Sequence, residues 1–127
     1  MKKGTKCRAD ACPQPFEIRK LFADRDVYEL VANEDVSTEE VRQREGGGEE
    51  ELRQEYVYTM RLATVTLDGY EAAAAALIGL KYSTGDEFSL MRKGLSDPAN
   101  EEYVEYIDYV ERCKSFARGY FGGGGNE

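Results

Sequence analysis

The three cysteines are the residues best suited to chemistry in this chain, because the sequence contains no histidine. Cys7 and Cys12 lie five residues apart in a polar segment flanked by prolines, and Cys113 lies far along the chain. A structural zinc ion takes four ligands, mostly Cys and His, so we predict no metal site. The odd number of cysteines favours free thiols, and a Cys7–Cys12 disulfide is the alternative.

Other catalytic patterns are also missing from the sequence. No histidine is present to activate a serine, and the carboxylates fall in polar segments where nothing would perturb them. The glycine runs 46–48 and 122–125 lack the Lys and Ser or Thr of a phosphate-binding loop. We therefore predict no catalytic residue, no cofactor and no enzyme activity; an unrecognised carboxylate site is the alternative.

Length and charge narrow the class of protein further. A chain of 127 residues with a net charge of -8 fits one acidic domain. Affinity for a phosphate backbone comes from Lys and Arg, so we expect no direct nucleic-acid contact. No apolar run approaches the roughly 20 residues of a membrane span, and the lysines at the start precede a polar stretch rather than the apolar core of an export signal. We expect a cytoplasmic protein that does not bind membranes.

Alternating apolar and polar residues predict three antiparallel strands. Residues 16–22 and 27–31 form a hairpin around the polar turn 23–26, and residues 56–63 form a third strand. In that strand we expect the set Tyr56, Tyr58, Met60 and Leu62 to face the helices, because the opposite register would bury Arg61.

Three segments are expected to lack regular structure. Residues 1–15 form an irregular lead-in interrupted by two prolines. Residues 34–51 form a mobile acidic loop, since the stretch 33–55 holds nine acids against three bases and loses apolar periodicity. Residues 122–127 form a flexible glycine-rich tail. A single domain is thus expected over residues 16–121.

Three helices are expected after the strands. An alanine-rich run predicts the first over residues 70–80. A capping box of Thr84 and Glu87 would begin the second, with Phe88, Met91 and Leu95 on its apolar side and Gly94 at its end. Asp97 would cap the third. Strands followed by helices predict an α+β fold, with the three helices packed on one face of a three-stranded sheet.

The last helix supplies the candidate interface residues. Apolar side chains recur at helical spacing along it and predict a buried stripe. Tyr109 lies outside this stripe on the polar side, and Tyr120 and Phe121 lie just before the glycine tail. Tyrosine is common in protein interfaces, so Tyr109, Tyr120 and Phe121 are the predicted contact residues; an ordinary exposed tyrosine is the alternative for Tyr109.

Three stretches of the sequence resemble known proteins. Residues 26–33, 81–87 and 102–114 are similar to those of short proteins encoded in the structural modules of tailed phages and prophages. The resemblance implies a role in a virion or in tail assembly, and it carries no catalytic or ligand residues. It does not include the insertion 46–48 or the glycine tail.

Two functions are therefore considered besides the alternative of an enzyme with an unrecognised carboxylate site. The first is a non-enzymatic structural or assembly protein of a phage tail or head, which binds other proteins, a homo-oligomer included, in the host cytoplasm or in the virion. The second is a small acidic inhibitor, in which residues 33–55 mimic a nucleic-acid backbone and block a basic groove of a host protein.

Overall fold

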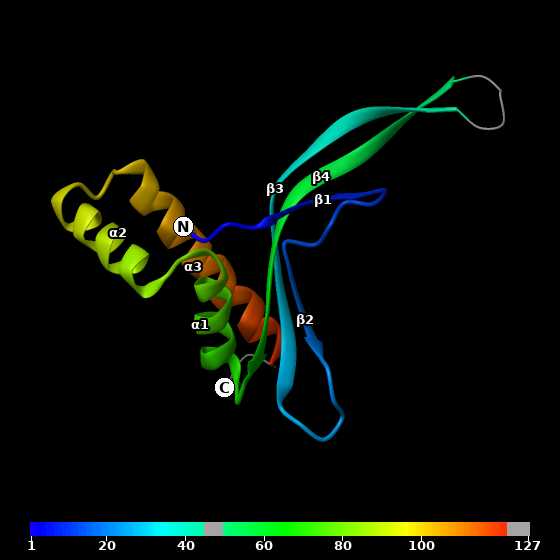
Figure 1. Cartoon of the computed structure of the whole chain (residues 1–127). Helices are drawn as coiled ribbons and strands as arrows, with labels where there is room; N and C mark the ends of the chain where they lie inside the picture. The colour runs from blue at the N-terminus through cyan, green and yellow to red at the C-terminus, as the bar shows by residue number, and fades with distance from the viewer. Residues whose placement is uncertain (45–49, 122–127) are drawn as a thin grey trace.

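Four antiparallel strands form one sheet in the computed structural model, which describes residues 1–44 and 50–121. The strands are β1 (Thr5–Ala9), β2 (Phe16–Lys20), β3 (Val27–Arg44) and β4 (Glu50–Thr66), and the helices are α1 (Tyr70–Lys81), α2 (Thr84–Ser96) and α3 (Glu101–Tyr120) (Figure 1). The predicted α+β class is confirmed. The predicted number of three strands is wrong, because the strand order is β1-β4-β3-β2.

The additional strand comes from the expected lead-in. β1 pairs with β4, so that Thr5 lies opposite Met60 and Ala9 lies opposite Tyr56. Pro13 and Pro15 lie in the connection after β1, where they remove no hydrogen bond from the sheet. The prediction of an irregular segment over residues 1–15 is therefore wrong for residues 5–9.

The expected acidic loop is an extended ladder. β3 and β4 remain paired from Ser37 opposite Val57 to Arg44 opposite Glu50, and the two strands project beyond the other elements as an arm (Figure 1). The negative charge is compensated locally, because the guanidinium of Arg8 lies 2.9 Å from Glu39 and 4.0 Å from Glu55. The prediction of a mobile loop over residues 34–51 did not anticipate these charge partners. Residues 45–49 of that segment and the predicted tail, residues 122–127, lie outside the described part of the chain.

A β-bulge marks the base of the arm. Glu34 lies opposite Thr59 and Ser37 lies opposite Val57, so two residues of β3 oppose one residue of β4. One of these two, Asp35, has a φ of 53°, a left-handed conformation that Asp tolerates better than most residues. Bulges bend and twist a strand, which accounts for the change in direction of the arm (Figure 1).

The helices cover the face of the sheet opposite to the predicted one. Ala63 and Val65 pack against the core, whereas the Leu62 side chain is 51% exposed. Leu30 and Ala32 of β3 lie opposite Ala63 and Arg61, respectively, and both are fully buried. The register prediction is wrong because it treated Arg61 as a charge that the core could not accommodate.

Arg61 is accommodated by a cluster of charges between the sheet and α1. Its guanidinium lies 3.2 Å from one carboxylate oxygen of Glu34, and the ammonium of Lys81 lies 2.5 Å from the other. The three side chains are only 11–13% exposed. Lys81 also lies over the rings of Tyr82 and Tyr109, so the cluster joins β3, β4 and the end of α1 to α3.

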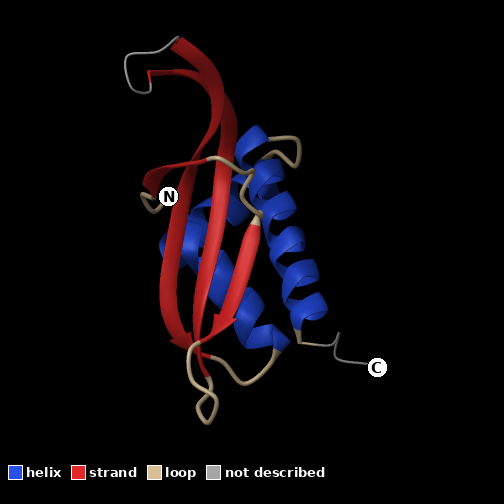
Figure 2. Ribbon diagram, turned by 90° about the vertical axis from the view of Figure 1, so that its right-hand side faces the viewer, coloured by secondary structure: helices blue, strands red, loops and turns tan. Residues whose placement is uncertain are grey.

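The core lies between this face of the sheet and the helices α1 and α3 (Figure 2). The predicted helix over residues 70–80 is confirmed, and it buries Ala73, Ala74, Leu77 and Leu80. α3 begins later than expected: Asn100 caps it by accepting a hydrogen bond from the Tyr103 amide, while Asp97 ends α2. α2 packs chiefly on α3, so the prediction of three helices on the sheet holds for only two of them.

We predict that Glu34→Gln lowers the free energy of unfolding by about 3 kcal/mol, because it leaves two poorly exposed cations without their carboxylate. Urea denaturation measures this change. The matched control is Glu39→Gln, which breaks the exposed pair with Arg8 and should cost less than about 1 kcal/mol. Equal effects of the two substitutions would contradict a structural role for the cluster.

Candidate protein-interaction surface

Tyr109 is one of three predicted contact residues, and the structure places it in the core. Its side chain has no exposed surface, and its hydroxyl donates a hydrogen bond to the Leu77 carbonyl at 2.9 Å. The ring packs against Phe16 and Tyr82, with centroid distances of 5.8 and 5.6 Å. The prediction that Tyr109 lies on the polar side of its helix is wrong, because the sheet and α1 approach α3 from that direction as well. A fully buried side chain offers no contact to a partner.

Tyr120 and Phe121 lie at the end of α3, partly packed on the sheet. Their rings contact Tyr28 of β3, with centroid distances of 6.4 and 5.7 Å. Tyr120 remains 44% exposed. Both residues therefore close the core at this end, and a contact between them and a partner stays a prediction.

A group of exposed apolar side chains lies on α2, where the sequence predicted core packing. Phe88, Met91 and Leu95 are 63%, 46% and 87% exposed. The residues of α2 that are buried are Leu90 and Gly94, on the side that faces α3. The apolar spacing correctly identified one face of the helix, but it did not show that this face points away from the protein.

Several interactions hold α2 in this orientation. Ser83 accepts a hydrogen bond from the Asp86 amide and donates its own amide to the Asp86 carboxylate, which forms the capping box one residue earlier than predicted. Lys93 pairs with Glu102 of α3 at 3.1 Å. Such interactions fix the start of the helix and its position on α3.

Gly94 allows the two helices to approach closely. It is buried inside α2 rather than ending it, and a Cβ at this position would overlap the ring of Tyr103. At the other end of the contact, the Tyr106 hydroxyl donates a hydrogen bond to Glu87 at 2.7 Å. Burial, and then this hydrogen bond, raise the pKa of Tyr106, so it stays protonated at neutral pH.

The exposed apolar surface continues onto α3. Val104 and Ile107 are 51% and 38% exposed. At 100° per residue they lie on one side of α3, and Glu102 lies on the other. On α2, Met91 and Leu95 likewise lie on the side opposite to Lys93. Because Lys93 pairs with Glu102, both apolar groups occupy the same side of the helix pair. We call this surface, formed by Phe88, Met91, Leu95, Val104 and Ile107, the α2–α3 apolar face.

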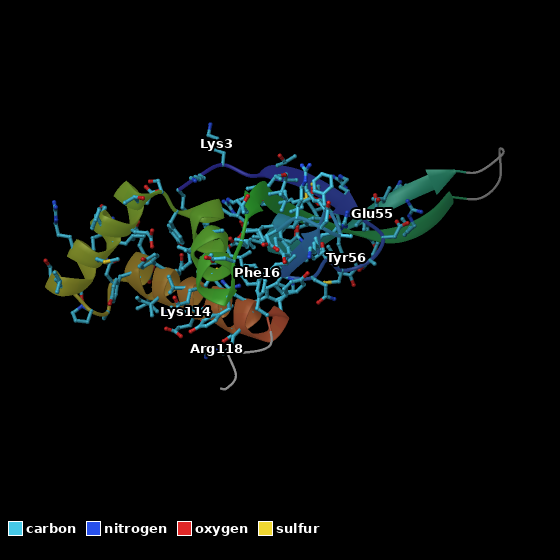
Figure 3. The ribbon with its side chains drawn as sticks, turned by 90° about the horizontal axis from the view of Figure 1, so that it is seen from below. Lys3, Phe16, Glu55, Tyr56, Lys114 and Arg118 are labelled. Atoms are coloured by element: carbon cyan, nitrogen blue, oxygen red, sulfur yellow. The ribbon has the colours of Figure 1, made fainter. Side chains whose placement is uncertain are left out.

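This face lies at one end of the molecule. α2 extends beyond the sheet at the end opposite to the arm in two views (Figures 1 and 3). Phe16 of β2 contacts Tyr109 and Phe116, which lie on roughly the opposite side of α3 from Val104 and Ile107. The α2–α3 apolar face is therefore directed away from the sheet.

Potential metal ligands are dispersed in the described part of the chain. Within residues 1–44 and 50–121, no three potential metal ligands lie together. A hollow of about 520 Å³ on the open face of the sheet is lined partly by Glu17 and Glu29, but Glu17 is exposed and Glu29 lies 3.8 Å from Arg19. The buried amide oxygen of Asn33 in the same hollow has no partner among these residues. This arrangement does not supply a paired acid and base.

The three cysteines are free and differ in environment. Cys12 is exposed and Cys7 is partly exposed, whereas Cys113 has no exposed surface. Burial raises the pKa of the Cys113 thiol to about 12. Cys113 is thus a small apolar core residue, since a thiol with such a pKa is a poor nucleophile at neutral pH.

Comparisons with known proteins do not extend this description. No protein-family model matches the chain, and neither the curated proteins nor the solved structures contain a significant match to it. Among the helices described here, none combines the length and the apolar character that crossing a membrane requires. The candidate surface therefore stands on the geometry alone.

We predict that Gly94→Ala lowers the free energy of unfolding, or the protection of α2 from hydrogen exchange, because the added methyl group overlaps the Tyr103 ring. The control is Gly79→Ala in α1, where a Cβ meets nothing within 4 Å. That substitution should stabilise the protein by up to about 1 kcal/mol, as expected for Ala over Gly in a helix. Stabilisation by both substitutions would show that the close approach is absent.

The environment of Cys113 predicts a dependence of stability on pH. Folding raises the pKa of this thiol, so above about pH 8.5 the unfolded chain loses the proton while the folded protein keeps it. The free energy of unfolding should fall as the pH rises from about 9 to 12, with up to about 1.4 kcal/mol per pH unit from this thiol. Cys113→Ala should reduce the slope, and Cys12→Ala should leave it unchanged. Rapid reaction of Cys113 with a thiol reagent in the native protein at pH 8 would contradict its burial.

Proposed function

We propose that this chain is a non-enzymatic structural or assembly protein of a phage particle, in the tail or as a head accessory, and that it acts by binding other proteins. The observation that carries the proposal is the α2–α3 apolar face. The face joins five large apolar side chains on two helices, three of them more than half exposed. Contiguous apolar surface of this kind is typical of protein interfaces.

The energetics favour a partner on this face. Full burial of a Leu, Met or Phe side chain is worth about 1.5–3 kcal/mol relative to its exposure, and α2 leaves one of each between 46% and 87% exposed. The helix is nevertheless held by its capping box and by the packing of its buried residues Leu90 and Gly94 on α3. A rigid surface loses little conformational entropy on binding, so α2 is well suited to dock on another protein.

The resemblance to phage structural modules supplies the biological setting of the proposal. The partners are other proteins of the particle or of its assembly, a second copy of the chain included, and the site of action is the host cytoplasm or the virion. The net charge of -8 opposes direct contact with nucleic acid.

An acidic inhibitor is the second candidate, and one observation favours it. The acidic segment lies on a paired arm, and a rigid arm presents charge more effectively than a loop does. Against it, Arg8 and Arg53 pair with carboxylates of the same arm, which lowers the charge available to a basic groove.

One genetic experiment separates the two candidates. The substitution Leu95→Glu, introduced into the gene in the cells that produce the phage particles, should lower particle yield at least about tenfold. The reason is that it would place a charge in the contact with the partner, where burial of a charge costs more than about 1.4 kcal/mol. The matched control is Leu52→Glu, at a 62% exposed position on the arm, which should have no effect. Normal yield for both variants, with no copy of the chain in particles or assembly intermediates, would overturn the proposed function. If only the double substitution Glu39→Lys with Glu40→Lys changes particle yield, the acidic inhibitor is favoured.

A further inference from the structure

The two outer edges of the α2–α3 apolar face carry opposite charges. Arg92 lies four residues after Phe88, which places it 40° further around α2 and away from α3. Asp108 lies four residues after Val104, in the equivalent position on α3, and Glu101 lies on the same side two turns earlier. All three side chains are exposed. Asp108 also pairs with Arg112 of its own helix at 3.0 Å, so the face has one basic residue at its α2 edge and an α3 edge of two acids and one Arg that is acidic on balance.

Such a face is complementary to itself under one particular symmetry. A two-fold axis parallel to the helix pair would place α2 of a second copy on α3 of the first, so that each basic edge meets an acidic edge. An axis across the helix pair would instead place α2 on α2 and α3 on α3, with like charges together. Favourable charge contacts therefore select the first arrangement.

The heights of the side chains along the helices agree with this arrangement. The contacts of Lys93 with Glu102 and of Gly94 with Tyr103 show which parts of the antiparallel α2 and α3 lie side by side. A rotation about a parallel axis keeps these heights, so Arg92 of the second copy falls midway between Glu101 and Asp108. By the same correspondence, its Met91 and Phe88 would lie near the heights of Val104 and Ile107, and its Leu95 would lie less than one turn before Val104.

The size of the face indicates how strong the association would be. α2 has 13 residues, so the face is about 20 Å long, and two helices make it about 20 Å wide. The face therefore covers roughly 400 Å², about half of the ~800 Å² per partner that stable dimers bury, which fits a weak and reversible association. The surroundings allow a second copy to approach, since the face is directed away from the sheet.

We propose that the α2–α3 apolar face binds a second copy of this chain and forms a reversible two-fold dimer, in which α2 of each copy packs on α3 of the other. The proposal rests on the proposed function in one respect only, namely that this face is a contact surface. It adds the identity of the partner and the geometry of the contact. The dimer is a four-helix bundle with two symmetry-related charge contacts.

Sedimentation of the full chain tests the proposal through a charge exchange. The wild type should change from monomer to dimer with concentration, and Leu95→Glu should remain monomeric. Arg92→Glu, and separately Glu101→Arg with Asp108→Arg, should each weaken the dimer roughly tenfold or more, because like charges then meet at both contacts. An equal mixture of these two variants should dimerise again, because both contacts in the mixed dimer are complementary.

Three outcomes would overturn the proposed dimer: a wild type that is monomeric up to about millimolar concentration, a dimer that resists Leu95→Glu, or a mixture that does not recover. Circular dichroism of each variant shows whether it has folded, and recovery in the mixture itself requires two folded chains. A monomeric wild type combined with loss of particles in Leu95→Glu would reject the dimer and leave the proposed function in place. If the wild type dimerises but loss of the dimer leaves the particle yield unchanged, the dimer stands and the proposed function is rejected.

Discussion

The carboxylate of Glu34, held between Arg61 and Lys81, is the interaction on which the arrangement of the two ends of this molecule depends. It lies directly before the bulge at Asp35 that starts the arm, and Lys81 is the last residue of α1. Burial of three charges is favourable only when each is paired, so the cluster fixes β3, β4 and α1 relative to one another. The position of the arm and the point at which α2 begins both follow from it.

From that fixed point the chain builds a helix that contributes little to the core. Tyr82 is packed under Lys81 and against Tyr106 and Tyr109, and the capping box at Ser83 starts α2 immediately afterwards. α2 then lies on α3 through its small and buried residues, with its large apolar residues outward. A helix that served only to cover the core would turn its large apolar residues toward the core. Within the described residues, the α2–α3 apolar face is thus left uncovered by the rest of the chain.

Much of the fold could be predicted from local patterns, because hairpins and helices depend on neighbouring residues. The strands around the turn 23–26 and the helix from Tyr70 follow from alternation and from the alanine run. The errors arose where the partner is distant in sequence. Arg61 looks unsuited to a core until Glu34 is opposite it, and the acidic stretch looks unstructured until β1 brings Arg8 beside it. The exposure of α2 was missed for a related reason, since periodicity identifies an apolar face without showing what covers it.

The central claim is that the α2–α3 apolar face is exposed in the single chain and buried in its assembly. Hydroxyl-radical footprinting of the wild type over a dilution series measures this directly. We expect Phe88 and Met91 to be oxidised readily in dilute protein and to become protected as concentration rises, while Leu52 and Leu62, which are also exposed, are oxidised at a constant rate. Constant oxidation of Phe88 and Met91 at every concentration, or protection of both at the greatest dilution, would contradict the account.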